Sequence, residues 1–231
     1  MVRQGLLFSV PLLVMIAALA ITGWFMVPQA EPIPVHWSAA GDVNRTSGHL
    51  EAFLAIPAIA VLLTLIFSVA PYIDPRGRNL QQSRPLWLAT WVGSLVILVI
   101  AQGVITLSAI GLLDADGATM PKLIGSAVAV FIAIIGNLLG KARPNWFAGI
   151  RTPWTLSSDR SWDVTHRWAA RLFMAAGLIS LIGLWATGEQ IGWIVMLVAI
   201  SIAALVPVGM SYFIWRNDPD KETYSADNDV H

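Results

Sequence analysis

A polar segment in the second half of the chain, residues 136–167, holds most of the side chains that could do chemistry. His166 follows Asp163 by three residues, so a helix would place its imidazole beside a carboxylate. Such a pair could act as a general base, but a base also needs a positioned partner and a substrate pocket. Polar neighbours at this spacing are common on helices. We therefore expect no catalytic residue and no enzyme, and a membrane hydrolase that uses His166 is the less favoured alternative.

The sequence also argues against metal and cofactor sites. It contains no cysteine, which excludes thiolate metal ligands, cysteine nucleophiles and disulfides. His36 and His49 lie together in a second polar segment, but two imidazoles without a third ligand make a poor zinc site. We expect both histidines to be solvated or hydrogen-bonded, and we predict neither a metal ion nor a cofactor.

The composition places these two polar segments in a membrane protein. Of the 231 residues, 56% are hydrophobic and 12% are charged, and the mean hydropathy is +0.68. A helix needs about 20 apolar residues to cross a bilayer. Every Asp, Glu, Lys and Arg lies outside six apolar stretches. We therefore predict an all-α, polytopic integral membrane protein whose six transmembrane helices cover residues 5–27, 52–70, 86–113, 123–139, 172–187 and 191–215.

The distribution of positive charge predicts how the chain crosses the membrane. If the N-terminus is cytoplasmic, every Lys and Arg except Arg45 and Lys122 lies on the cytoplasmic side. Cytoplasmic segments of membrane proteins carry an excess of these residues. We therefore expect both termini inside the cell, the segment 136–167 inside, and the histidine-containing segment outside.

Local signals predict the shape of the outer segment and some contacts within the spans. Turn residues around Gly41 and Gly48 predict that the outer segment folds back on itself. Gln102 and Thr106 lie inside the third span, where an interhelical hydrogen bond is the expected role. The 71–84 segment is expected to be a loop with a tight turn at residues 74–77.

The end of the fourth span is expected to pack against protein. Gly136 and Gly140 form a pair of small residues that permits close approach of another helix. Asn137 lies between them and needs a hydrogen-bonding partner.

Prolines and glycines predict irregular backbone over residues 141–156. Irregular backbone near a membrane needs internal hydrogen-bonding partners, and Asn145, Thr152, Thr155 and the Arg151 guanidinium can provide them. Arg151 could also stack on a neighbouring tryptophan.

A new helix is expected to begin after this irregular segment. Ser157 or Ser158 can cap its start, with Asp159 in the first turn. The helix should start as an amphipathic segment along the inner surface and continue into the fifth span. Its acidic and basic residues recur every four positions from 159 to 171 as a charged stripe. The last residues, 218–231, are acidic and are expected to be disordered.

The outer segment resembles the DUF1648 module, a membrane-embedded segment with a proline, histidine, aromatic and glycine signature. The matching residues are Pro34, His36, Trp37, Gly41, Asp42, Phe53 and Pro57.

The segment 136–167 resembles the signature of the SdpI family. Its core is the run of residues 149–156, G-I-R-T-P-W-T-L. The family usually has glycines after the T-H-R at 165–167, where this chain has W-A-A-R, so a function that depends on those glycines is in doubt. The other matching residues are Gly136, Asn137, Pro144, Asn145, Trp162, Thr165, His166 and Arg167.

The SdpI resemblance implies a six-helix immunity or signalling protein of the bacterial plasma (inner) membrane. Its founding member protects a bacterium from its own peptide toxin, and it is also regarded as a receptor that holds a small cytoplasmic repressor at the membrane. The expected partners are therefore the lipid bilayer, an amphipathic peptide toxin outside and a small transcriptional repressor inside, with no direct binding to nucleic acid. A membrane carrier or lipid-handling protein is the alternative, although its spans lack the ionisable residue that coupled transporters usually carry.

The resemblances also divide the chain and select candidate residues. Residues 1–70 form the DUF1648-like module, residues 71–217 the SdpI-like four-helix region, and residues 218–231 the tail. The residues predicted to bind a ligand or partner are His36, Trp37, Gly41, Asn137, Asn145, Gly149, Arg151, Thr152, Pro153, Trp154, Thr155, Trp162, His166 and Arg167.

Overall fold

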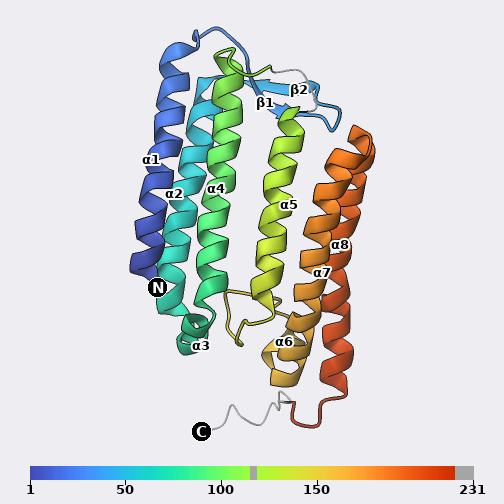
Figure 1. Cartoon of the computed structure of the whole chain (residues 1–231). Helices are drawn as coiled ribbons and strands as arrows, with labels where there is room; N and C mark the ends of the chain where they lie inside the picture. Colours follow the sequence, from blue (N-terminus) through green and yellow to red (C-terminus); the bar gives the residue numbers. More distant parts are fainter. Residues whose placement is uncertain (115–118, 222–231) are drawn as a thin grey trace.

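The computed structural model describes residues 1–114 and 119–221, and six long helices dominate this part of the chain (Figure 1). All six are long and apolar enough to cross a membrane, as the sequence predicts. They are α1 (Val2–Met26), α2 (His49–Ile73), α4 (Arg84–Ala109), α5 (Thr119–Leu139), α7 (Asp159–Ala186) and α8 (Glu189–Arg216).

The six helices pack as two groups of three. In the first group, α1 contacts both α2 and α4, and α2 contacts α4. In the second group, α7 lies between α5 and α8 and contacts both. The pair α4 and α5 joins the groups. Figure 1 shows the long helices with nearly parallel axes, and α2, α5 and α8 run opposite to α1, α4 and α7.

Side chains within the spans make the close contacts that the sequence predicts. The Gln102 amide donates to the Ala52 carbonyl oxygen at 3.3 Å, and the Thr106 hydroxyl donates to the Leu19 carbonyl oxygen at 3.2 Å. These bonds join α4 to α2 and to α1. A Cβ atom on Gly136 would lie 2.5 Å from the Met174 backbone nitrogen, so α5 and α7 touch where only glycine fits.

The prediction of an all-α fold omitted a small sheet. Strands β1 (Ile33–Trp37) and β2 (Val43–Ser47) form an antiparallel hairpin between α1 and α2. Gly41 in the turn has a φ of 95°, a left-handed conformation that glycine adopts without strain. The predicted reversal of this segment is therefore correct, but the strands are short and interrupted by register shifts, so their alternation is weak in the sequence.

Two predicted boundaries are wrong. Helix α2 continues through Pro71 to Ile73, and a short helix α3 (Gly77–Gln82) follows where a loop was expected. The tight turn between them is correct, since the Gly77 N–H donates to the Asp74 carbonyl oxygen at 3.1 Å. Helix α4 ends at Ala109 rather than at residue 113, because Gly111 adopts a φ of 73° in the following turn.

The bundle has two different ends. We call the end with β1 and β2 the hairpin end. The opposite end has α3, the short helix α6 (Pro153–Leu156) and the irregular residues 140–152, and we call it the loop end. The chain starts at the loop end, and α8 also finishes there (Figure 1).

Candidate functional site

The irregular segment at the loop end is built around the buried side chain of Asn145. Its amide group donates to the carbonyl oxygens of Arg143 and Ala148, at 2.7 and 3.0 Å. Its carbonyl oxygen accepts from the N–H groups of Phe147 and Ala148, at 2.9 and 2.6 Å. Four hydrogen bonds therefore fold residues 143–148 around one amide, as expected for a buried polar group.

Gly149 and His166 fix the next turn. Gly149 has a φ of 123°, and a Cβ atom there would lie 2.4 Å from the His166 Nε2 atom. Nε2 accepts the Ile150 N–H at 2.9 Å, and Nδ1 donates to the Trp162 carbonyl oxygen at 2.8 Å. His166 is thus a neutral connector between the loop and α7.

Trp162 holds the other side of this arrangement. Its ring stacks on the His166 ring with centroids 4.0 Å apart, and its indole N–H donates to the Ala142 carbonyl oxygen at 2.8 Å. Trp162 is fully buried, so this tryptophan belongs to the protein interior rather than to a headgroup belt.

Thr152 and Thr155 close the segment with a capping box at the start of α6. The Thr152 hydroxyl accepts the Thr155 N–H at 3.1 Å, and the Thr155 hydroxyl oxygen accepts the Thr152 N–H at 2.9 Å. Thr152 also shares a hydrogen bond of 3.2 Å with Ser211 of α8. Ser158 then caps α7 by accepting the Ser161 N–H at 2.8 Å, which confirms the predicted cap.

Four residues in α3 and in the turns on either side of it also hold this segment, and the sequence analysis did not select them. The Asn79 amide donates to the Pro144 carbonyl oxygen at 2.9 Å, and the Ser83 hydroxyl accepts the Arg143 N–H at 2.8 Å. The Asp74 carboxylate accepts the Trp146 N–H, and Arg76 donates to the Leu156 carbonyl oxygen. A single sequence could not predict these contacts, because the two residues of each pair are 60 or more positions apart.

The positively charged Arg151 bonds to the backbone, and within residues 1–114 and 119–221 it makes no contact with the face of an aromatic ring. Its Nη1 atom donates to the carbonyl oxygens of Trp146 and Phe147, at 2.9 and 3.1 Å. The expected role as an internal partner is confirmed. Trp154 contacts the Tyr212 ring of α8 edge-on, and Pro153 is exposed at the first position of α6.

One predicted feature of the loop end differs in the structure. Asn137 is exposed on α5 and makes no side-chain hydrogen bond within the described residues, because it points away from the α5–α7 contact that Gly136 makes. The stripe from Asp159 to Arg171 forms no ion pair in the described part of the chain, and Arg167 is exposed. Helix α7 is one continuous helix, so its amphipathic start extends the span directly.

The candidates His36, Trp37 and Gly41 lie on the hairpin, far from the loop end (Figure 1). The exposed His36 shares a hydrogen bond of 2.6 Å with the Asn44 side chain on the other strand. Trp37 ends β1 and is partly buried against the apolar cluster beneath the hairpin. His49 is buried and donates to the Val27 carbonyl oxygen at 3.0 Å. The predicted hydrogen bonding of both histidines is confirmed.

The first residues of the tail are ordered, contrary to the prediction. The Ser158 hydroxyl donates to the buried Asp218 carboxylate at 2.5 Å. This bond, helped by the positive charges of Arg160 and Lys221, holds the pKa of Asp218 below its usual value. The prediction is wrong for Asp218 because acidic composition alone predicts disorder, whereas this carboxylate has a specific partner in Ser158. Residues 222–231 lie outside the described residues.

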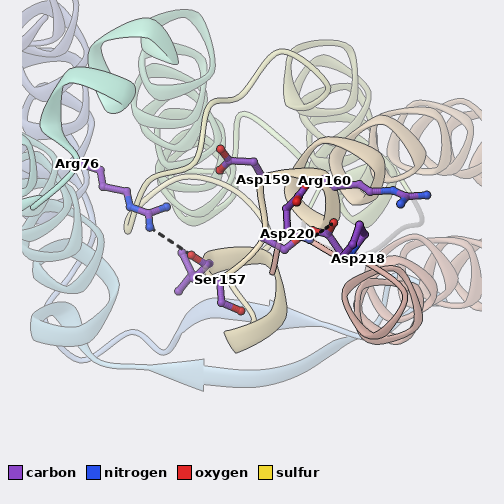
Figure 2. A pocket seen from close by; sticks show the side chains of 9 residues that line it. Arg76, Ser157, Asp159, Arg160, Asp218 and Asp220 are labelled. Carbon is purple, nitrogen blue, oxygen red and sulfur yellow. Dashed lines mark hydrogen bonds between the residues drawn. The ribbon is translucent and has the colours of Figure 1, made fainter. Parts of the chain in front are cut away.

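Two polar pockets open at the loop end. One of about 380 Å³ is lined by Arg76, Ser157, Asp159, Arg160 and Asp218, and Figure 2 shows Arg76 reaching toward Ser157 from the opposite side. A second pocket, of about 280 Å³, is lined by residues 140–143 together with Asp163 and Arg167. We call the second one the basic pocket, since Lys141, Arg143 and Arg167 outnumber its single carboxylate.

This geometry limits what the candidate residues can do. Both ring nitrogens of His166 are engaged with backbone groups, so neither is available to take a proton from a substrate. The arrangement therefore argues against the hydrolase hypothesis. Most of the family-signature residues build the loop, and the exposed charges around it are the groups that a partner can reach.

Comparisons with known proteins agree with the loop signature. Residues 141–211 match the model of the SdpI/YfhL protein family. Over 186 aligned residues the chain is 27% identical to the Immunity protein SdpI of Bacillus subtilis (strain 168), and the alignment covers 80% of this chain and 84% of that protein. No solved structure matches the chain significantly. The comparisons do not bear on the DUF1648-like resemblance or on the division at residue 70, which stay predictions.

Proposed function

We propose that this chain is a member of the SdpI family and a membrane immunity protein that protects its cell from a peptide toxin. The observation that carries the proposal is the similarity to an immunity protein along 80% of the chain. The matched family segment begins within the hydrogen-bonded loop and includes α6, α7 and most of α8. The similarity therefore extends over membrane helices as well as over the loop motif.

We propose that the loop end faces the cytoplasm of a bacterial cell and that the hairpin end faces outward. The concentration of Lys and Arg at the loop end supports this orientation, since positive residues are retained on the cytoplasmic side during insertion. Both termini are then cytoplasmic, and the membrane is the plasma (inner) membrane.

The hairpin end is the proposed contact for the toxin. In the part of the chain that the structure describes, the sheet has two strands, so one edge of each strand has no partner strand. Such edges accept extended peptides. Exposed His36 and the partly buried Trp37 add a polar and an aromatic group beside those edges. An amphipathic peptide approaching the outer membrane surface would meet this hairpin first.

The loop end is the proposed contact for a small cytoplasmic repressor. The basic pocket presents Lys141, Arg143 and Arg167 around one carboxylate. A partner with an acidic surface would complement these charges, and the association would weaken as salt is raised. The buried hydrogen bonds behind the pocket keep its backbone in place.

Expression in a toxin-sensitive bacterial host tests the immunity proposal. We expect cells that make the protein to survive a toxin concentration that kills cells without it. The double variant His36→Ala and Trp37→Ala should lose protection while protein level stays normal, whereas Lys141→Glu with Arg143→Glu should keep it. Equal killing with and without the protein would reject immunity to that toxin.

Co-localisation of the repressor tests the receptor proposal separately. A fluorescent fusion of a candidate repressor should move to the membrane when toxin is present, and Lys141→Glu with Arg143→Glu should abolish the movement. Movement that persists in the charge-reversed variant would exclude the basic pocket as the contact. Substrate-dependent flux in proteoliposomes would instead favour the carrier alternative.

A further inference from the structure

The basic pocket at the loop end brings three cations together. Its volume is about 280 Å³, and the charged residues that line it are Lys141, Arg143, Asp163 and Arg167. Across residues 1–114 and 119–221, none of the three cations makes a side-chain hydrogen bond, an ion pair or a contact with the face of an aromatic ring. Other cations at this end are bonded, since Arg76 and Arg151 each donate to the backbone. The three positive charges of the pocket are therefore available to a ligand.

The backbone that carries two of these cations is held by hydrogen bonds. The Lys141 N–H donates to the Leu138 carbonyl oxygen at 3.1 Å, in the turn that follows α5. The Arg143 N–H donates to the Ser83 hydroxyl at 2.8 Å, and its carbonyl oxygen accepts from the Asn145 amide at 2.7 Å. The pocket is therefore formed in the folded chain before a ligand binds, which lowers the cost of ordering it on binding.

The contact between α5 and α7 places the pocket at the surface of the membrane. A Cβ atom on Gly140, just after α5, would lie 3.8 Å from the Arg167 Cα atom, so Arg167 is level with the end of that span. Next to it on α7, Trp168 is 44% exposed, and the Arg171 guanidinium carbon lies 5.3 Å from the centre of its ring. Tryptophan and arginine side chains are typical of the level where acyl chains meet headgroups. The basic pocket therefore lies beside the headgroups of the bilayer.

The charge of the pocket selects an anionic occupant. Three cations against one carboxylate leave an excess of positive charge. The non-bridging oxygens of a phosphate accept hydrogen bonds from ammonium and guanidinium groups, and the guanidinium can bind two of them at once. The bilayer presents phosphates at this level in high local concentration. An anionic headgroup fits better than a zwitterionic one, because the excess positive charge repels the cation of a zwitterionic headgroup.

We propose that the basic pocket binds the phosphate of an anionic glycerophospholipid, with the phosphate oxygens accepting from Lys141, Arg143 and Arg167. The acyl chains of this lipid lie in the adjoining bilayer. The inference does not depend on which side of the membrane the loop end faces, or on the immunity proposal. It adds a condition to the repressor proposal, since the lipid and an acidic partner would compete for the same three charges.

Three arginines outside the pocket provide a matched control. Arg3, Arg78 and Arg84 are exposed at the loop end, on α1, α3 and α4, and none of them lines the basic pocket. Replacing these three by glutamine removes as much positive charge from the loop end as replacing the three pocket cations. Only the second change removes the proposed site. Asp163→Asn changes the pocket in the opposite direction, since it removes the exposed carboxylate.

Native mass spectrometry of the full chain tests the proposal, with nanodiscs of phosphatidylcholine that contain increasing fractions of phosphatidylglycerol. We expect the wild type and the control variant Arg3→Gln, Arg78→Gln and Arg84→Gln to bind one phosphatidylglycerol per chain with the same affinity. The affinity of the pocket variant Lys141→Gln, Arg143→Gln and Arg167→Gln should be about ten-fold lower. The affinity of Asp163→Asn should be about three-fold higher. Thermal unfolding checks that each variant is folded.

Inorganic phosphate distinguishes a lipid headgroup from a free anion, since it offers the same oxygens without acyl chains. An excess of inorganic phosphate added to the nanodiscs should leave the bound phosphatidylglycerol in place. Displacement of the lipid by inorganic phosphate would assign the pocket to a soluble anion and overturn the proposal.

Three further results would contradict the lipid site. One is equal binding of phosphatidylcholine and phosphatidylglycerol by the wild type. Another is an equal loss of affinity in the two triple variants, which would show attraction to the whole positive surface rather than to one pocket. The third is an unchanged or lower affinity in a folded Asp163→Asn variant, which keeps all three cations of the pocket.

Discussion

The polar residues at the two ends of this helix bundle differ in their burial and in their hydrogen-bonding partners. At the loop end, Asn145, Thr155 and His166 are buried and bonded to backbone groups. At the hairpin end, His36 is exposed, and the ion pair between Arg45 and Glu51 has side chains that are 57% and 48% exposed. The residues of the loop signature are therefore needed for the folded structure of the loop. The exposed side chains of the hairpin can be replaced without unfolding the protein.

The largest difference between the ends should appear in Gly149→Ala compared with Gly111→Ala. Both glycines have positive φ, but only Gly149 also lacks space, because a Cβ atom would meet His166. We expect Gly149→Ala to lower the unfolding free energy by about 2–5 kcal/mol, and Gly111→Ala by about 1–2 kcal/mol. Thermal unfolding in detergent measures both. An equal loss would mean that the His166 contact does not stabilise the loop.

The next largest effect is the difference in stability loss between replacing the buried His166 and replacing the exposed His36. His166→Phe leaves the Ile150 N–H and the Trp162 carbonyl without side-chain partners, which should cost about 2–4 kcal/mol. His36→Phe removes an exposed hydrogen bond and should cost about 0.5 kcal/mol or less. Protein yield and thermal unfolding test this pair. Loss of a catalytic turnover in His166→Phe with unchanged stability would instead support the role as a base, which the hydrogen bonds of His166 argue against.

A smaller effect concerns the Asp218 contact and depends on pH. Since the Ser158 hydroxyl holds the pKa of Asp218 below its usual value of 3.8, the contact stabilises the folded state above that pH and is lost as pH falls further. Asp218→Asn should therefore lower the melting temperature at neutral pH, and the difference from wild type should shrink below about pH 4. A pH-independent difference would show that ionisation of Asp218 does not contribute.

The smallest effect is expected at the hairpin. Arg45→Ala removes an exposed ion pair with a distance of 2.6 Å between Nη1 and Oε1. Exposed pairs typically contribute about 0.2–1 kcal/mol, and salt screens them. A loss larger than that of His166→Phe would reverse the proposed contrast between the two ends.

Local patterns in the sequence predicted much of this structure. Apolar runs gave the number of spans, Gly136 marked the α5–α7 contact, and Ser158 marked the start of α7. Each of these signals lies within a few residues of the feature it determines. The hydrogen bond from Gln102 was also predictable, because a lone amide within an apolar span needs a partner.

Long-range contacts could not be predicted in the same way. Asp74 and Asn79 bind the loop from more than 60 positions away, and Ser158 binds Asp218 from 60 positions away. The family resemblance selected His166 and Gly149 as candidates for binding a ligand or partner, which stays a prediction. Their contact depends on the missing Cβ atom of Gly149, which only the folded geometry reveals. Asn137 was selected by the same resemblance, yet it has no part in this contact.

Single-cysteine labelling tests the proposed division between the two ends most directly, because the chain has no cysteine of its own. Thr46→Cys places a thiol on the exposed hairpin, and Asp220→Cys places one at the exposed loop end. With a membrane-impermeant maleimide, the account predicts labelling of Thr46→Cys in intact cells and of Asp220→Cys only after the membrane is opened. Labelling of both variants in intact cells, or the reverse pattern, would contradict it.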